Sequence, residues 1–160
     1  MKKFIALISL FVFAMSLTAC MSLDSYLNNT VEPTKSDLLI SAMGEFTTEE
    51  HYRYGWWQDG ATYSKYTYKS VNLNNEYLSQ ITESDIEEIE HNISEFEFWV
   101  SSSKTSEDDK TLYENYDFDV SIIDTNDYWF VEYDETDERD FDLFIFDTET
   151  NVLYGFSYSI

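Results

Sequence analysis

Aromatic and aliphatic residues alternate with polar residues through the C-terminal part of the chain. The last run is the clearest case, because Val152, Tyr154, Phe156 and Tyr158 occupy every second position. A period of two places successive side chains on opposite faces of an extended strand. Three earlier runs have a similar strand-like character, and the four runs together are Tyr116–Ile123, Tyr128–Tyr133, Phe141–Phe146 and Val152–Tyr158. Short connections usually join antiparallel neighbours, so the sequence predicts a four-stranded antiparallel meander.

An amphipathic helix is predicted before these strands. Apolar residues recur at steps of three and four, at Ile86, Ile89, Ile93, Phe96 and Val100. This spacing forms one apolar stripe along a helix. Ser84 and Glu87 have the spacing of a capping box, so we expect the helix to begin there. A helix with one apolar face covers one face of a sheet, and the sequence therefore predicts an α+β domain of two layers.

A hairpin is predicted nearer the N-terminus. The runs Glu50–Trp57 and Thr62–Val71 flank Asp59-Gly60, a pair that is typical of two-residue hairpin turns. In this register Trp56 lies opposite Tyr63.

Two segments in this region also have helical patterns. Residues 47–57 could instead form a helix, because Thr47 would cap it with Glu50 three residues on. We prefer the hairpin for that segment. Residues 36–43 have apolar residues at helical spacing, and Gly44 would end a short helix there.

The charge of the chain bears on both folding and function. Nine basic and 32 acidic residues give a net charge of −23 at pH 7. Such a charge by itself favours disorder. The 12 Phe, 13 Tyr and 4 Trp oppose it, since each buried ring removes a large apolar area from water. The sequence thus predicts an acidic folded domain, and its few basic residues argue against nucleic-acid binding, which needs positive charge against the phosphates.

The first twenty residues combine a basic start, an apolar run and a cysteine. Lys2 and Lys3 precede an apolar run at 4–15, as in secretory signal peptides. Leu17-Thr18-Ala19-Cys20 then resembles the lipobox of bacterial lipoproteins, a motif that has a branched apolar residue, a small or polar residue, a small residue and a cysteine. The resemblance implies that a diacylglycerol is attached to the sulfur of Cys20 and that a signal peptidase cleaves before this residue. It covers residues 1–20, and Cys20 is the single cysteine of the chain.

This resemblance sets the expected organisation of the chain. We expect a signal peptide at 1–19, a lipidated cysteine and polar tether at 20–45, and one acidic α+β domain at 46–160. Two acyl chains hold a protein stably at a bilayer where one binds only marginally. The expected location is therefore the extracytoplasmic face of the cell membrane. The domain loosely resembles small uncharacterised lipoproteins of low-GC Gram-positive bacteria in its Asp147-Thr148-Glu149-Thr150 hairpin and its aromatic C-terminal strand, a resemblance that implies no activity.

Aromatic residues around the predicted hairpin are candidates for a ligand-binding patch. They are Trp56, Trp57, Tyr63 and Tyr66. Flat rings with polar tips stack on sugars and contact protein partners. The simpler interpretation, which we favour, is that these residues cover half-buried sheet surface, where strands prefer aromatic side chains.

Four carboxylates in an acidic loop are candidates for a calcium site. They are Asp134, Asp137, Asp140 and Asp142. Calcium prefers six to eight oxygen ligands from a flexible loop, but this loop lacks the glycine and glutamate spacing of an EF-hand. We favour a solvated loop that keeps a sheet edge from pairing.

The sequence contains no convincing catalytic set. His51 and His91 are its only histidines, and Ser94, three residues after His91, has no nucleophile-elbow context. We therefore predict a membrane-anchored binding or interaction module that is not an enzyme and has no cofactor, with a protein or glycan partner. The alternatives are a glycan-capturing lipoprotein that uses the aromatic patch and a calcium-stabilised surface domain.

Overall fold

The computed structural model describes residues 33–55, 59–106, 109–135, 137 and 139–160. Contacts divide the chain into two units, Met1–Pro33 and Thr34–Ile160, and nearly all the described residues belong to the second. The elements of this second unit are α2 (Lys35–Met43), β1 (Phe46–Gly55), β2 (Gly60–Tyr68), β3 (Ser79–Gln80), α3 (Ile86–Thr105), α4 (Thr111–Asn115), a 3-10 helix (Val120–Ile122), β4 (Tyr128–Tyr133), β5 (Phe141–Asp147) and β6 (Val152–Ser159). None of the helices in the described part of the chain combines the length and the apolar character that crossing a bilayer requires.

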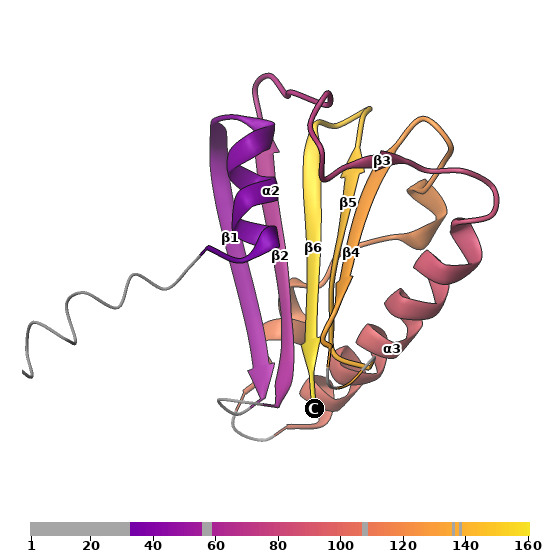
Figure 1. Ribbon diagram of the computed structural model, residues 1–160. Coiled ribbons are helices and arrows are strands. Elements are labelled where there is room, and N and C mark those ends of the chain that lie inside the picture. Colours follow the sequence, from indigo (N-terminus) through magenta and orange to yellow (C-terminus); the bar gives the residue numbers. More distant parts are fainter. Residues whose placement is uncertain (1–32, 56–58, 107–108, 136, 138) are drawn as a thin grey trace, which may run out of the picture. The chain divides into compact units, whose positions relative to one another are not determined.

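All the strands in the described part of the chain join one antiparallel sheet of six strands, in the order β1-β2-β6-β5-β4-β3 (Figure 1). The β1–β2 hairpin lies beside β6, so that β2 pairs with the last strand of the domain. The predicted α+β class, with a helix packed on an antiparallel sheet, is confirmed.

The sheet is apolar on both faces, because several strands carry large apolar residues at consecutive positions. On β5, Leu143 and Ile145 belong to one hydrophobic cluster, whereas Phe144 and Phe146 belong to another. The first cluster contains the apolar stripe of α3, and we call that side of the sheet the α3 face. The second contains Leu39 and Met43 of α2, and we call the opposite side the α2 face. The sequence predicted one covering helix, but burial of both faces requires two.

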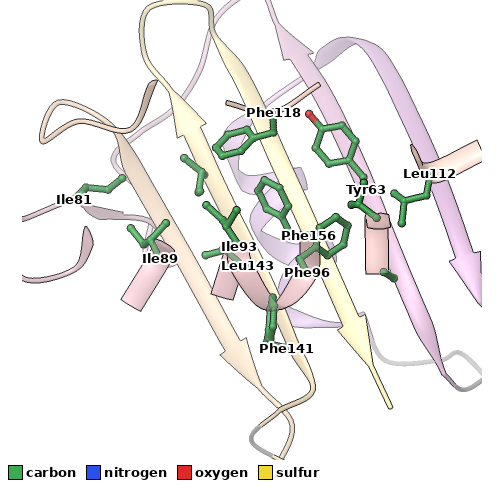
Figure 2. Packing of buried hydrophobic residues seen from close by; sticks show 13 residues of the cluster. Tyr63, Ile81, Ile89, Ile93, Phe96, Leu112, Phe118, Phe141, Leu143 and Phe156 are labelled. Carbon is green, nitrogen blue, oxygen red and sulfur yellow. The ribbon is translucent and has the colours of Figure 1, made fainter. Parts of the chain in front are cut away.

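The α3 face carries the larger core. Phe96 of α3 meets Phe156 of β6 at 5.4 Å between ring centroids, in an edge-to-face arrangement. Figure 2 shows Ile89, Ile93 and Phe96 directed toward the sheet, where Leu143 and Phe156 lie. The predicted stripe thus forms the helix side of this core.

The start of α3 differs from the expectation in its capping residues. The helix begins at Ile86, and the polar contacts before it come from Thr82 and Asp85. The Thr82 backbone N–H and hydroxyl both donate to the Asp85 carboxylate, at 2.8 and 2.7 Å. The helix therefore starts two residues after Ser84, where the capping box was predicted.

The α2 helix extends the domain beyond the predicted N-terminal boundary. It begins with a capping box in which Asp37 N–H donates to the Thr34 hydroxyl at 3.1 Å and Thr34 N–H donates to the Asp37 carboxylate at 3.0 Å. Leu39 and Met43 are fully buried against the sheet. The compact unit therefore starts at Thr34, and the expected boundary at residue 46 is corrected because this helix is part of the core.

The segment Tyr116–Ile123 is not a strand, and this prediction was wrong. Asp119 accepts a hydrogen bond from Ser121 N–H at 2.9 Å and caps the 3-10 helix Val120–Ile122. Polar side chains that bond their own backbone compete with strand pairing. Only Phe118 of the alternating apolar residues is buried, and the C-terminal meander therefore has three strands, β4, β5 and β6.

The predicted hairpin is present, but its turn is longer than expected. Tyr52 pairs with Tyr63 and Gly55 pairs with Gly60, so β2 starts at Gly60 itself. The predicted pairing of Trp56 with Tyr63 is therefore wrong by four residues, because the partner of Tyr63 is Tyr52. Trp56 and Trp57 lie outside the described residues.

Candidate functional site

The α2 helix covers only part of its face of the sheet. An apolar row of cross-strand partners packs in the same cluster as Leu39 and Met43 of α2, and its members are Tyr128, Phe146, Leu153 and Tyr66. The next row on the same face contains Phe130, Phe144, Gly155, Ser64 and His51, and it is mixed in character. Polarity therefore increases along the face, away from the strand ends that α2 covers.

The third row consists of polar residues only. Its members are direct cross-strand partners on five successive strands, and we call them the polar row: Glu132, Asp142, Ser157, Thr62 and Arg53. Neighbouring strands are about 4.8 Å apart, so these side chains are regularly spaced across the sheet. Arg53 is exposed and the other four are half-buried.

The N-terminus of α2 contacts one end of the polar row. Lys35 Nζ forms a salt bridge of 2.8 Å with Glu132, and the Ser36 hydroxyl donates to the Asp142 carboxylate at 2.9 Å. The hydrogen bond and the charge of Glu132 raise the pKa of the Lys35 ammonium. These contacts hold Glu132 and Asp142, the two carboxylates at one end of the polar row. Ser157, Thr62 and Arg53 continue the row away from these contacts.

Two surface hollows adjoin the polar row. One, of about 420 Å³, lies at the start of α2 and is lined by residues that include Lys35, Glu132 and Asp142. The other, of about 250 Å³, includes Arg53, Thr62 and Ser157 in its lining. Asp142, Tyr158 and Ser159 line both hollows, so the two hollows are adjacent. Together they offer carboxylate acceptors, hydroxyls that include those of Thr62 and Ser157, and the cationic side chains of Lys35 and Arg53.

The aromatic patch expected from the sequence is not formed by its described members. Tyr63 is completely buried on the α3 face, and Tyr66 is 5% exposed on the α2 face. Burial raises the pKa of Tyr66 to about 12. These two residues therefore belong to two different cores, and Trp56 and Trp57 lie outside the described residues.

The acidic-loop carboxylates have separate protein partners. Asp137 forms a salt bridge of 2.7 Å with Arg139, and hydrogen bonds from Arg139 lower the pKa of the Asp137 carboxyl to about 2. Asp140 accepts from the Ile160 backbone N–H at 2.9 Å and from the Ser159 hydroxyl at 3.0 Å, whereas Asp142 accepts from Ser36. The Asp134 backbone N–H donates to the Asp140 carbonyl at 2.9 Å, which closes the loop. Within the described ranges no three His, Cys, Asp or Glu side chains are grouped so that they could hold a metal ion.

His51 forms a hydrogen-bonded chain that sequence spacing did not reveal. Its Nδ1 lies 3.0 Å from the Ser64 hydroxyl on the paired strand, and its Nε2 lies 2.6 Å from Glu49. Serine, histidine and carboxylate are thus in line, but Ser64 is only 7% exposed. This burial favours a structural contact between β1 and β2. His91 is on the exposed side of α3, in a hollow that it shares with Arg139.

The polar row was missed because its members are far apart in the sequence. Asp142 interrupts the aromatic run of β5, and Ser157 occupies the alternate position beside Phe156 and Tyr158. Each is unremarkable alone, and only the strand register aligns them. Comparison of the chain with known protein families, with curated proteins and with solved structures found no match.

Proposed function

We propose that this chain is a lipid-anchored, extracytoplasmic binding module without catalytic activity, and that the polar row is its ligand-binding surface. The polar row itself is the observation that carries the proposal. A sheet with large apolar residues on both faces gains stability by covering them. The side chains of the polar row are polar, so covering that half of the α2 face would bring little hydrophobic stabilisation. This half remains accessible beside two hollows.

The chemistry of the row favours a ligand with several hydroxyl groups. Carboxylates accept hydrogen bonds, hydroxyls donate and accept, and guanidinium groups only donate. A sugar hydroxyl can satisfy any of these groups, whereas an anionic ligand would be repelled by Glu132 and Asp142. A glycan is therefore the second, more specific candidate, with the polar row replacing the aromatic patch as its contact surface.

The proposed location rests on the lipobox resemblance at Leu17–Cys20. The protein carries a net charge of −23, and anionic headgroups would repel it. A lipid on Cys20 would supply the attraction that the protein surface lacks. Fractionation of cells that express the chain tests this point, because Cys20→Ser should move it from the membrane fraction to the soluble or secreted fraction.

Titration of the full chain with soluble cell-wall glycan fragments tests the binding surface. The double variant Thr62→Val/Ser157→Ala removes two hydroxyls from the polar row. Each net hydrogen bond contributes about 0.5–1.5 kcal/mol, so affinity should fall at least about fivefold. Thr67→Val is the matched control, because Thr67 lies on β2 but faces the α3 side.

The control variant should bind like the wild-type chain. Equal glycan affinity in the double variant and in the wild-type chain would overturn the polar row as the contact surface. An absence of binding to any fragment would overturn the glycan candidate. A protein partner captured by the wild-type chain and lost by the double variant would then support the broader binding proposal.

A further inference from the structure

The β1 strand forms a long edge of the sheet. It has ten residues, and it pairs with β2 on one side. Within the described part of the chain, no strand pairs with its other side. The opposite edge differs, because there the two-residue strand β3 covers part of β4. Exposed edge strands present rows of N–H and C=O groups that can pair with another chain.

The strand register shows which backbone groups of β1 point outward. Tyr68 N–H donates to the Asn151 carbonyl at 3.0 Å, continuing the β2–β6 register. Backbone groups of successive residues point alternately to the two sides of a strand. The backbone N–H and C=O groups of even-numbered β2 residues therefore point toward β6, and those of odd-numbered β2 residues point toward β1. Through the β1–β2 pairing, the backbone groups of Glu49, His51 and Arg53 point away from the sheet.

We propose that β1 pairs antiparallel with β1 of a second copy of this chain, about a two-fold axis at His51. Such an axis, perpendicular to the sheet, pairs residues that share a face. Glu49 of each copy then lies opposite Arg53 of the other, so two carboxylate–guanidinium pairs form on the α2 face. The pairs 49–53, 51–51 and 53–49 each exchange two backbone hydrogen bonds.

Charge selects this register over its neighbours. An axis at Glu50 would place the two Glu50 carboxylates opposite each other. An axis at Tyr52 would place His51 opposite Arg53, so that neither of these residues would face a carboxylate of the other copy across the strand pair. Opposite charges across a strand pair are favourable and like charges are unfavourable. The register at His51 is the one that pairs both charged residues of this face with their opposites.

The other face of β1 fits the same register. Glu50 and Tyr52 become cross-strand partners between the two copies. Within one chain the Tyr52 hydroxyl already donates to Glu50, at 2.5 Å. A second copy would offer the same donor and acceptor at neighbouring positions. The two six-stranded sheets would then form one continuous sheet, and each polar row would meet Glu49 of the other copy beyond Arg53.

Light scattering of the full chain in excess detergent, with the detergent mass subtracted, tests the proposal. A single chain has a mass of 18.9 kDa, and the wild-type protein should approach twice this value as its concentration rises. Arg53→Glu and Glu49→Arg should each weaken dimerisation about tenfold, because each turns two favourable pairs into unfavourable ones. The double variant Glu49→Arg/Arg53→Glu restores opposite charges and should restore the dimer.

Two controls separate pairing from other effects. Glu90→Arg on the exposed side of α3 changes the net charge as Glu49→Arg does, and it should leave the dimer intact. Circular dichroism should show that the variants keep the fold, since Glu49 and Arg53 are exposed. A wild-type monomer at all concentrations would overturn the proposal. So would a dimer that both single variants leave unchanged, or a double variant that fails to recover it.

Discussion

The ring of Phe144 lies over Gly155, its cross-strand partner on β6, in space that any larger residue at position 155 would need. An added Cβ atom at Gly155 would stand 2.7 Å from Cε1 of the Phe144 ring. Phe144 is buried in the same cluster as Leu39 of α2. The glycine therefore lets an aromatic ring lie close to the sheet, at the border between the apolar half of the α2 face and the polar row.

Substitution Gly155→Ala should destabilise the domain by about 1–3 kcal/mol, the usual cost of forcing extra volume into a packed core. Urea unfolding of the two proteins would measure this difference. The double variant Gly155→Ala/Phe144→Leu should recover part of the lost stability, because leucine at position 144 is smaller than phenylalanine and leaves room for the added Cβ atom at position 155. Equal unfolding midpoints for Gly155→Ala and wild type would contradict the close packing.

Leu39→Ala should destabilise the domain by about 2–5 kcal/mol, since Leu39 is fully buried between α2 and the sheet. Leu38→Ala is the matched control on the same helix, where the side chain is half-buried, and its cost should be smaller. Urea unfolding again gives both values. A negligible effect of Leu39→Ala would mean that α2 is not part of the core, and that the domain starts near residue 46.

Asp117 should make the domain lose stability in acid. The Asp117 carboxylate accepts from Lys65 and from the Tyr63 hydroxyl, each at 2.9 Å. Burial acts to raise the pKa of Asp117, but these hydrogen bonds outweigh it and the pKa is lowered. A carboxyl whose pKa is lower in the folded state than in the unfolded state stabilises the fold at pH values above its unfolded-state pKa, which is about 4. This contribution to stability is lost as the pH falls through the folded-state pKa.

Urea unfolding of wild type and Asp117→Asn at several pH values would isolate this contribution. The stability difference between the two proteins should be constant near neutral pH and should shrink below about pH 4. The same variant removes the charge that faces Lys65, so the difference at neutral pH should favour the wild type. A difference that does not change with pH would exclude Asp117 as a source of acid sensitivity.

Buried tyrosines should make the domain unfold in alkali. Burial raises the pKa of Tyr63, Tyr68 and Tyr116 well above the ordinary value. Above about pH 10 the unfolded chain ionises these tyrosines while the folded chain does not, so stability falls as the pH rises. Tyrosinate absorbance should therefore rise together with loss of structure. Tyr68→Phe should reduce the alkaline loss of stability, whereas Tyr113→Phe, at an exposed position, should not.

Calcium should leave the melting temperature of the chain unchanged relative to a chelator. Asp137, Asp140 and Asp142 each have a different protein partner, and Arg139 adds a positive charge beside Asp137. A ligand that binds only the folded state must raise its stability. A higher melting temperature in calcium, abolished by Asp140→Asn, would instead support the calcium site predicted from the sequence.

The elements with strong periodicity were predictable. The helix stripe from Ile86 to Val100 and the alternation of Val152–Tyr158 each follow from one repeating pattern, and both elements are present. Local signals were less reliable where two of them competed. Tyr116–Ile123 alternates like a strand, but Asp119 caps a 3-10 helix there. The pair Asp59-Gly60 indicated a turn, but the pairing of Gly55 with Gly60 lengthens it.

The candidate site was not predictable, because it depends on register. Glu132, Asp142, Ser157, Thr62 and Arg53 come from five strands, and a shift of one residue in any pairing would move that strand's member to the other face. Sequence reasoning instead selected Tyr63 and Tyr66 for their chemistry. The alternation of side chains along a strand already places Tyr63 and Tyr66 on opposite faces. That both faces are buried at β2 follows from its position between β1 and β6, which no local pattern specifies.

The sequence alone determined the properties that follow from local spacing and composition: the α+β class, the amphipathic helix, the hairpin and the acidic, aromatic-rich character of the chain. Tertiary structure decided the properties that depend on which residues meet across long separations. It placed the β1–β2 hairpin beside β6, set α2 against the second face of the sheet, and left the polar row open. The physical reason is that side-chain periodicity is encoded residue by residue, whereas strand order and register are selected by the burial of both sheet faces together.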